Sequence, residues 1–257
     1  MRSFAPRRPE RSRNPHCRAI ATAIAEQSIG FRMSTLFVAG AGTEIGKTYV
    51  TAALTRALRA SGRPVRALKP VASGVPDLSD PDFSASDTAL LLAAQDLPVT
   101  PETVAAMTPW RFAAPLAPDL AAAREGRSLA LADLVAWCET AIAAPAPGTA
   151  VLIEGVGGLM SPLTAEATGL AWLKALRLPV LLVSGSYLGA ISHALTAIET
   201  LHHHAVDLRA VVVSETPGAP TPPETVAEAI ARHAGVRVLC VARGGGFPAE
   251  GLDVVPA

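Results

Sequence analysis

The fold of this chain is decided by one glycine-rich stretch, Gly40-Ala41-Gly42-Thr43-Glu44-Ile45-Gly46-Lys47-Thr48. The apolar run at 36–39 predicts a buried strand before it, and the periodicity of 47–60 predicts a helix directly after it. Glycines let backbone N–H groups face phosphate oxygens at a helix N-terminus, where a lysine contacts phosphates and a threonine hydroxyl ligates magnesium. We therefore expect a nucleotide phosphate-binding loop.

Two features of this stretch depart from the common G-x-x-x-x-G-K-[ST] pattern. Five residues rather than four separate Gly40 from Gly46, and Ala41 stands where the pattern expects glycine. A glycine-rich turn without a ligand is the alternative. Gly-Lys-Thr opening a helix directly after an apolar strand favours a variant phosphate-binding loop.

Beyond the loop, short apolar runs alternate with longer periodic segments. Strands are predicted at 65–68, 150–153, 180–183, 209–213 and 236–241, and helices near 190–204 and 222–234. Uninterrupted apolar strands that alternate with helices are typical of a parallel sheet covered on both faces. We expect a three-layer α/β domain of the P-loop NTPase type, with a mostly parallel sheet, over residues 33–257.

The middle of the chain, residues 76–118, is rich in prolines and acidic residues. It has a helical pattern at 87–95 and no clear strand. Segments of this kind in α/β enzymes usually lie over the carboxyl ends of the strands, where ligands bind. We interpret it as a cover over the active site rather than a linker.

Composition excludes several classes of protein. Of 257 residues 17% are charged, and 22 basic residues balance 22 acidic ones, so the chain is neither a disordered protein nor one suited to coating nucleic acid. The most apolar stretch, 169–185, is interrupted by charged residues and proline, which argues against a membrane span. Three widely spaced cysteines predict neither disulfides nor a zinc site and fit a reducing cytoplasm.

The first 32 residues differ from the rest, with seven arginines against two acidic residues. A transit-like peptide is one interpretation, because the segment is Arg-rich and acid-poor. A disordered basic tail, or a start assigned too far upstream, is favoured because Met33 directly precedes the first strand. We expect the catalytic domain to begin at residue 33.

Lysine is scarce, with Lys47, Lys69 and Lys174 beside 19 arginines. Lys69 closes the strand 65–68, and the carboxyl ends of parallel strands share one edge, so Lys69 should face the same crevice as Lys47. Pro70 restricts Lys69 to extended geometry. A structural surface lysine is the alternative for Lys69, and Lys174 fits a solvated helix surface.

Two carboxylates are candidates for holding magnesium, which prefers oxygen ligands. Glu154 ends the strand 150–153 and precedes Gly155-Val156-Gly157-Gly158. Asp87 follows Ser86 at a helix start, where an ordinary helix cap explains it equally well. His202, His203 and His204 point about 100° apart on a helix, so we interpret them as a polar helix end rather than a metal site.

Several of these segments together resemble the dethiobiotin synthetase family. They occur in the family's order and span about residues 34–215. They are the loop 40–48, Lys69-Pro70-Val71-Ala72-Ser73-Gly74, Ser86-Asp87, FAAPLAPDLAAAREG at 112–126, Glu154 with its glycines, and 188–193.

The resemblance implies an ATP-dependent ligase of biotin biosynthesis. In the family, 7,8-diaminopelargonate, CO2 and MgATP give dethiobiotin, ADP and phosphate through a carbamate and a carbamic-phosphoric anhydride. The family is a homodimer whose substrate lies near the subunit boundary. Partners of this chain would then be small molecules and a second copy, with no nucleic acid or membrane.

The resemblance also assigns roles. Lys69 would stabilise the carbamate, Lys47 would neutralise phosphate charge, and Thr43 would act on the γ-phosphate side. The nucleotide would contact Glu44, Ile45, Gly46, Lys47, Thr48, Tyr49, Asp87, Glu154, Gly155, Val156, Gly157, Ser214 and Glu215, with Mg²⁺ on Thr48, Asp87 and Glu154. The substrate would contact Ser73 and, in the partner, the helix start at Gly189, Ala190, Ile191 and Ser192, with Tyr187 nearby.

Ser214-Glu215 departs from the family, which often has Asn-Asp there to recognise adenine, and so does the segment 241–246. Asp119 replaces a common histidine. Serine cannot supply the paired donor and acceptor of an amide, so we expect weak selection for adenine.

Two rival functions remain open at this point. A related P-loop amidoligase or kinase-like enzyme would act on another substrate, although none of the cysteines lies in a motif for glutamine use. A partitioning-type switch ATPase carries a lysine five residues before the loop lysine, where this chain has Gly42.

Overall fold

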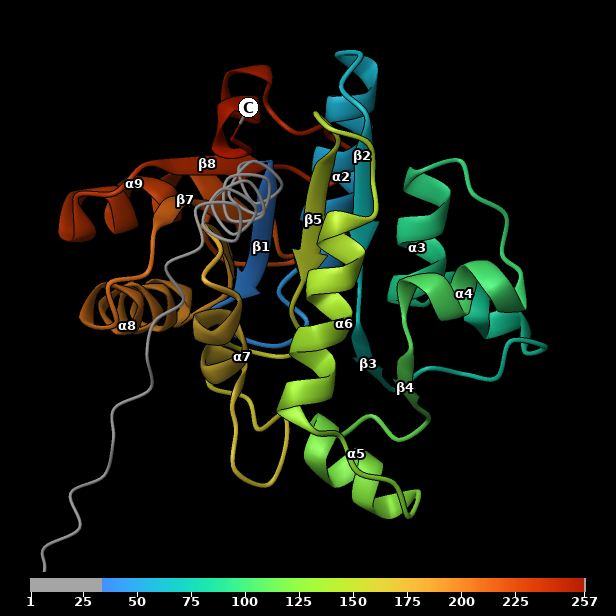
Figure 1. Ribbon diagram of the computed structural model, residues 1–257. Helices are drawn as coiled ribbons and strands as arrows, with labels where there is room; N and C mark the ends of the chain where they lie inside the picture. The colour runs from blue at the N-terminus through green and yellow to red at the C-terminus, as the bar shows by residue number, and fades with distance from the viewer. Residues whose placement is uncertain (1–33, 257) are drawn as a thin grey trace, which may run out of the picture.

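A parallel sheet of six strands forms the centre of the protein (Figure 1) in the computed structural model, which describes residues 34–256. The strand order is β2-β5-β1-β6-β7-β8, and every neighbouring pair is parallel. All carboxyl ends therefore meet at one edge. The strands are β1 (Thr35–Gly40), β2 (Val65–Leu68), β5 (Ala150–Glu154), β6 (Val180–Gly185), β7 (Leu208–Ser214) and β8 (Val238–Val241).

Two hydrophobic cores lie on opposite faces of this sheet, because successive side chains of a strand point to opposite sides. Phe37, Ile153 and Leu182 belong to one core, and Val38 and Leu152 to the other. The first is covered by α6 (Leu131–Ala143), α7 (Gly169–Leu176), α8 (Ala190–His203) and α9 (Pro223–Ala234), and the second by α2 (Lys47–Ala60), α3 (Asp87–Ala94), α4 (Pro101–Met107) and η2 (Ala249–Val254).

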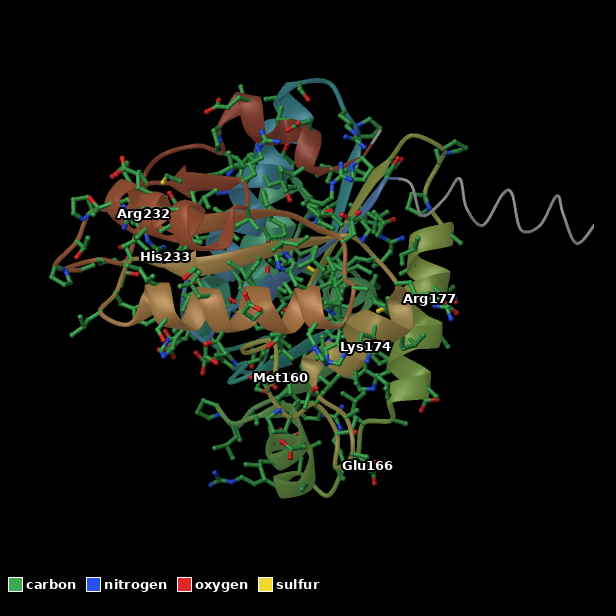
Figure 2. All side chains as sticks on the ribbon, turned by 90° about the vertical axis from the view of Figure 1, so that its left-hand side faces the viewer. Met160, Glu166, Lys174, Arg177, Arg232 and His233 are labelled. Atoms are coloured by element: carbon green, nitrogen blue, oxygen red, sulfur yellow. The ribbon has the colours of Figure 1, made fainter. Side chains whose placement is uncertain are left out.

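This architecture confirms the predicted three-layer α/β fold. Figure 1 shows α6 in front of the sheet, and Figure 2, turned toward α8 and α9, shows Arg232 and His233 at the end of α9. The helix predicted at 47–60 has those bounds in α2, and the strand predicted at 65–68 has those bounds in β2. The last strand begins at Val238 rather than at residue 236.

A second, two-stranded sheet lies outside the main one. β3 (Val71–Ser73) pairs in parallel with β4 (Trp110–Phe112), and the short helices η1 (Pro81–Ala85), α3 and α4 lie between them in the chain. The expectation that residues 76–118 contain no strand is therefore wrong. A strand of three residues is too short to show the alternation that a longer strand displays. After β4, α5 (Pro118–Arg124) leads to α6.

Several sequence interpretations concern segments outside the core. Those for residues 1–32 lie outside the part of the chain that the structure describes. Within residues 34–256, no helix combines the length and the apolar character needed to cross a bilayer.

Lys174 is exposed on α7, and α8 ends at His203. The described residues contain no group of three or more His, Cys, Asp or Glu side chains placed to hold a metal.

Candidate active site

The glycine-rich loop connects the carboxyl end of β1 to the N-terminus of α2. Gly46 is the residue before the helix and has φ of 91°, a conformation that favours glycine. No side chain caps α2, and no acidic residue stands in its first turn. The positive end of the helix dipole and its first N–H groups are therefore directed at the space where a phosphate would bind.

Lys47 folds back along its own loop. Its Nζ donates to the carbonyl oxygen of Gly42 at 2.9 Å. A Cβ at Gly40 would lie 2.7 Å from Lys47 Cδ, so this path requires glycine at position 40. Burial, together with the neighbouring Lys69 ammonium, lowers the pKa of Lys47 to about 8 against the opposing effect of Glu154 and Asp87. The negative charge of a bound phosphate would favour the protonated, positively charged form of Lys47.

Residues from three separate elements meet at Glu154, the last residue of β5. The Thr48 hydroxyl, on α2, donates to Glu154 Oε1 at 2.6 Å. Lys69 Nζ, at the end of β2, donates to the same oxygen at 2.6 Å and to the Gly155 carbonyl at 3.1 Å. Lys69 also forms an ion pair of 2.9 Å with Asp87 Oδ2, at the start of α3. Glu154 is fully buried and Lys69 is 2% exposed.

The charges of this group stabilise one another. Burial alone would lower the pKa of Lys69, but the carboxylates of Glu154 and Asp87 outweigh it and raise the pKa above its usual value. Burial raises the pKa of Asp87, yet Lys69, with hydrogen bonding from Thr48, lowers it overall. Lys69 is therefore a buried side chain that keeps its positive charge. Ser86 caps α3 through its side chain, and Asp87 instead contacts Lys69.

One oxygen of Glu154 indicates that this site fits a metal ion. Glu154 Oε2 is buried and has no hydrogen-bond partner within the described chain, whereas Oε1 has two. A buried carboxylate oxygen is costly to leave without a partner. Mg²⁺ usually binds to one or two carboxylates together with substrate phosphates. The oxygens of Thr48, Asp87 and Glu154 form such a set.

The glycines after β5 pack against the phosphate-binding loop. Leu159 N donates to the Gly40 carbonyl at 2.8 Å, and a Cβ at Gly158 would lie 3.3 Å from Gly42 Cα. A Cβ at Gly155 would lie 3.1 Å from the Phe37 ring. Gly158 and Leu159 are therefore held beside the loop by close backbone contact, and Gly155 packs on Phe37 of β1.

Two unpartnered polar atoms lie in the segment that follows Lys69 and in α5. Ser73 Oγ, at the end of β3, and Asp119 Oδ1, in the first turn of α5, are buried without a hydrogen-bond partner among residues 34–256. The family resemblance implies that Ser73 contacts the substrate, and Asp119 stands where a histidine is common in the family. Both retain free hydrogen-bonding capacity.

The start of α8 provides a second uncapped helix N-terminus. Gly189 precedes the helix with φ of 98°, and no side chain caps it. Ala190 is buried, whereas Ile191 and Ser192 lie in the first turn and remain at least partly accessible. Leu188, directly before them, is 89% exposed. The Tyr187 hydroxyl hydrogen-bonds to His193 Nδ1 at 2.8 Å beside the loop residues Thr43 and Glu44.

Ser214 and Glu215, which the family resemblance assigns to the nucleobase together, lie in different environments. Ser214 is fully buried, and a side chain at Gly46 would collide with its hydroxyl, so Ser214 lies beneath the loop. The Glu215 carboxylate accepts the backbone N–H of Arg243 at 2.7 Å. The sequence singled out the segment 241–246 as a departure from the family but gave Arg243 no role of its own. Its position between the last strand and Gly244-Gly245-Gly246 was the available signal.

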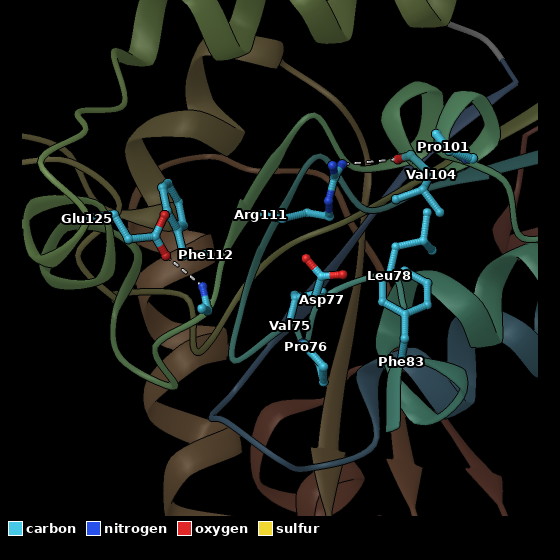
Figure 3. A pocket seen from close by; sticks show the side chains of 11 residues that line it. Val75, Pro76, Asp77, Leu78, Phe83, Pro101, Val104, Arg111, Phe112 and Glu125 are labelled. Carbon is cyan, nitrogen blue, oxygen red and sulfur yellow. Dashed lines mark hydrogen bonds between the residues drawn. The ribbon is translucent and has the colours of Figure 1, made fainter. Parts of the chain in front are cut away.

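A separate hollow lies between β4, η1 and α4 (Figure 3). Asp77 and Arg111 project into it, and Arg111 donates to the carbonyl of Val104. The Glu125 carboxylate accepts the backbone N–H of Ala113 at 2.7 Å at its edge. None of its lining residues belongs to the phosphate-binding loop. We therefore treat it as distinct from the candidate active site.

Comparison with known proteins supplies independent information about the family of this chain. A family model described as an AAA domain matches residues 34–242. The ATP-dependent dethiobiotin synthetase BioD of Acidiphilium cryptum (strain JF-5) is 46% identical over 205 residues, which cover 79% of this chain and 89% of that protein. The protein of the same name from Caulobacter vibrioides (strain NA1000 / CB15N) is 45% identical over 221 residues, covering 86% and 97%.

Among solved structures, a DUF1611 family protein from Anabaena variabilis ATCC 29413 superposes with a TM-score of 0.50 at 13% identity, covering 89% of this chain and 58% of that one. A likeness of this kind concerns the fold alone. The sequence identities to the two dethiobiotin synthetases, by contrast, extend over most of both chains. This chain belongs to the family of ATP-dependent dethiobiotin synthetases.

Proposed function

We propose that this chain closes the ureido ring of dethiobiotin, converting 7,8-diaminopelargonate, CO2 and ATP into dethiobiotin, ADP and phosphate. The observation that carries the proposal is the buried Lys69 ammonium, held between Glu154 and Asp87 beside the phosphate-binding loop. Such an ammonium suits an anion that forms next to the γ-phosphate. The rival functions are not favoured, because the relatives are named as dethiobiotin synthetases.

The first step needs a positive charge near the reacting carbon. One amine of the substrate attacks CO2 and loses a proton, which gives a carbamate anion. Lys69 is the group that stabilises this anion. Its three N–H bonds already point to Glu154, Asp87 and the Gly155 carbonyl, so the carbamate must replace one of these acceptors. The Gly155 carbonyl, at 3.1 Å, is the longest of the three contacts.

The second step transfers the γ-phosphoryl group, and the third closes the ring and releases phosphate. A carbamate oxygen attacks the γ-phosphorus and ADP leaves; the second amine then attacks the carbamate carbon, loses a proton and expels phosphate. Lys47 and the first N–H groups of α2 stabilise the phosphate charge, while Thr43 and Glu44 line its outer side. Thr48, Asp87 and Glu154 would hold Mg²⁺, which would neutralise charge on the phosphates.

We further propose that the active unit is a homodimer in which the start of α8 from the partner holds the substrate carboxylate. The uncapped N-terminus at Gly189 and the exposed Leu188 beside it support this. The substrate's amine end would lie at Ser73, whose hydroxyl has no hydrogen-bond partner in the described chain. Residues 33–257 would form the catalytic domain, and cysteine usage favours the cytoplasm as its location.

The test is ADP release with diaminopelargonate and bicarbonate present, with each omitted in turn. We expect ADP only when both are present, together with dethiobiotin of the correct mass. Equal ATP turnover without the diamine would instead identify a switch ATPase.

A further inference from the structure

Arg243, which follows β8, is an exposed residue whose side chain is nevertheless held in place by several contacts. Its guanidinium lies over the ring of Tyr49, 4.6 Å from the ring centroid. Its Nε donates to the Glu215 carbonyl at 2.9 Å, and its backbone N–H donates to the Glu215 carboxylate at 2.7 Å. An exposed arginine normally samples many rotamers, but in Arg243 one face of the guanidinium packs on Tyr49 and its Nε edge is held by Glu215.

Tyr49 connects this arginine to the phosphate-binding helix. It is the third residue of α2, and its hydroxyl donates to the carbonyls of Ala242 and Gly245 at 3.0 and 3.2 Å. The loop that carries Arg243 is thus attached to the first turn of α2. A Cβ placed at Gly244 or Gly246 would meet nothing within 4 Å, so the space beside this loop is open.

The position of Arg243 beside the phosphate-binding loop indicates which part of a bound nucleotide it would contact. Lys69 and Glu154 lie at the carboxyl ends of β2 and β5 on one side of β1, while Glu215 and Arg243 follow β7 and β8 on the other. A triphosphate whose γ-phosphate faces Lys69 must extend its nucleoside toward β7 and β8. Arg243 Nη2 would lie 3.6 Å from a Cβ at Gly46, next to the loop on that side.

We propose that Arg243 is the platform on which the nucleobase stacks, with Tyr49 and Glu215 as its positioning residues. This rests on the proposed function, since it assumes a nucleoside triphosphate oriented toward Lys69. Ser214 lies beneath Gly46, and the Glu215 carboxylate already accepts a hydrogen bond from Arg243. Base recognition by stacking on a planar cation tolerates any base, because every base has a π-face.

The experiment compares MgADP, MgCDP and magnesium tripolyphosphate, which has no base, by equilibrium binding to the full chain. Arg243→Ala and Arg243→Lys should each weaken ADP and CDP about tenfold and leave tripolyphosphate within about twofold. Tyr49→Phe, which keeps the ring but loses the hydroxyl contacts, should weaken both nucleotides about threefold. Arg232→Ala, which removes an exposed arginine on α9 (Figure 2), is the matched control and should bind all three normally.

Tripolyphosphate binding also reports that each variant is folded. Equal loss of tripolyphosphate and ADP in Arg243→Ala would overturn the proposal, because Arg243 would then hold phosphate charge. Full ADP binding by Arg243→Lys would overturn it as well, because a point charge would then suffice. Both readouts are binding constants, so a failure of diamine-dependent turnover would contradict the proposed function while leaving this measurement decisive.

Discussion

The two sides of the phosphate-binding loop are built on different physical principles. On the side of β2 and β5, Lys69 and Glu154 are buried and share hydrogen bonds with Thr48 and Asp87. On the side of β7 and β8, Arg243 is exposed and rests on Tyr49. Charges in a buried site interact strongly and are hard to rearrange, whereas exposed charges are screened. We infer that the first side imposes strict chemistry and the second tolerates variation.

The largest effect is expected from Glu154→Gln. Glutamine keeps the shape but removes the charge that Lys69 and a metal ion require, so turnover should fall at least about a hundredfold. Because the change also weakens a buried ion pair, stability in urea should fall, by up to about 3 kcal/mol. Steady-state kinetics and urea unfolding measure the two effects separately.

Glu166→Gln is the control for that variant, because Glu166 is exposed in the segment between β5 and α7 (Figure 2). It should behave like the wild type in both measurements. Turnover of Glu154→Gln within threefold of the wild type would contradict the interpretation that the β5 side is the strict one.

Lys69→Arg should have the next largest effect. A guanidinium keeps the charge but cannot replace a compact ammonium that points to three acceptors, so kcat should fall at least about tenfold. The phosphate-binding contacts remain, so the dissociation constant of ATP should stay within about twofold. Lys174→Arg is the control. Wild-type turnover in Lys69→Arg would remove Lys69 from the reaction.

The pH dependence of nucleotide binding tests Lys47. Its pKa is lowered from 10.5 to about 8, so above that value the folded protein loses the ammonium that a phosphate needs. Affinity for MgADP should fall about twofold between pH 7 and 8 and then by up to about tenfold per pH unit. Lys47→Arg, whose side chain stays charged, should remove this dependence. An affinity of the wild type for MgADP that does not change up to pH 9.5 would contradict this role of Lys47.

The same shift predicts the sign of a stability effect. Between pH 8 and 10.5 the unfolded chain retains the Lys47 proton that the folded chain has released, so unfolding takes up a proton. The Lys47 contribution therefore makes the free energy of unfolding rise with pH across this window. Lys47→Ala should lose that part of the rise when urea unfolding is measured at both ends of the window.

The smallest effect is expected on the β7 and β8 side, where we propose that the nucleobase binds. CTP and GTP should support turnover with kcat/KM within about tenfold of ATP, a difference of no more than about 1.4 kcal/mol. Specificity constants under one magnesium condition measure this. A thousandfold preference for ATP would show that backbone groups near residues 241–244 recognise adenine, and the contrast between the two sides would disappear.

Local pattern predicted much of the frame and missed the short elements. The helix 47–60 and the strand 65–68 were predicted with their observed bounds because apolar periodicity extends over several residues there. β3 and β4, of three residues each, escaped because their pairing, not their composition, makes them strands. The same holds at the site: local pattern left Asp87 as a helix cap or a ligand, and only the tertiary structure brings it into an ion pair with Lys69.

By itself, the sequence determined the phosphate-binding loop, the alternation of strands and helices, and the candidacy of Lys69 and Glu154, because these depend on residue types at short spacing. Only the tertiary structure decided that Lys69 and Glu154, 85 positions apart, share a hydrogen bond. It also decided that Ser214 is hidden beneath Gly46 and that Arg243 lies over Tyr49. Local preferences act over a few residues, whereas the direction of a side chain toward a distant partner is set by how the elements pack.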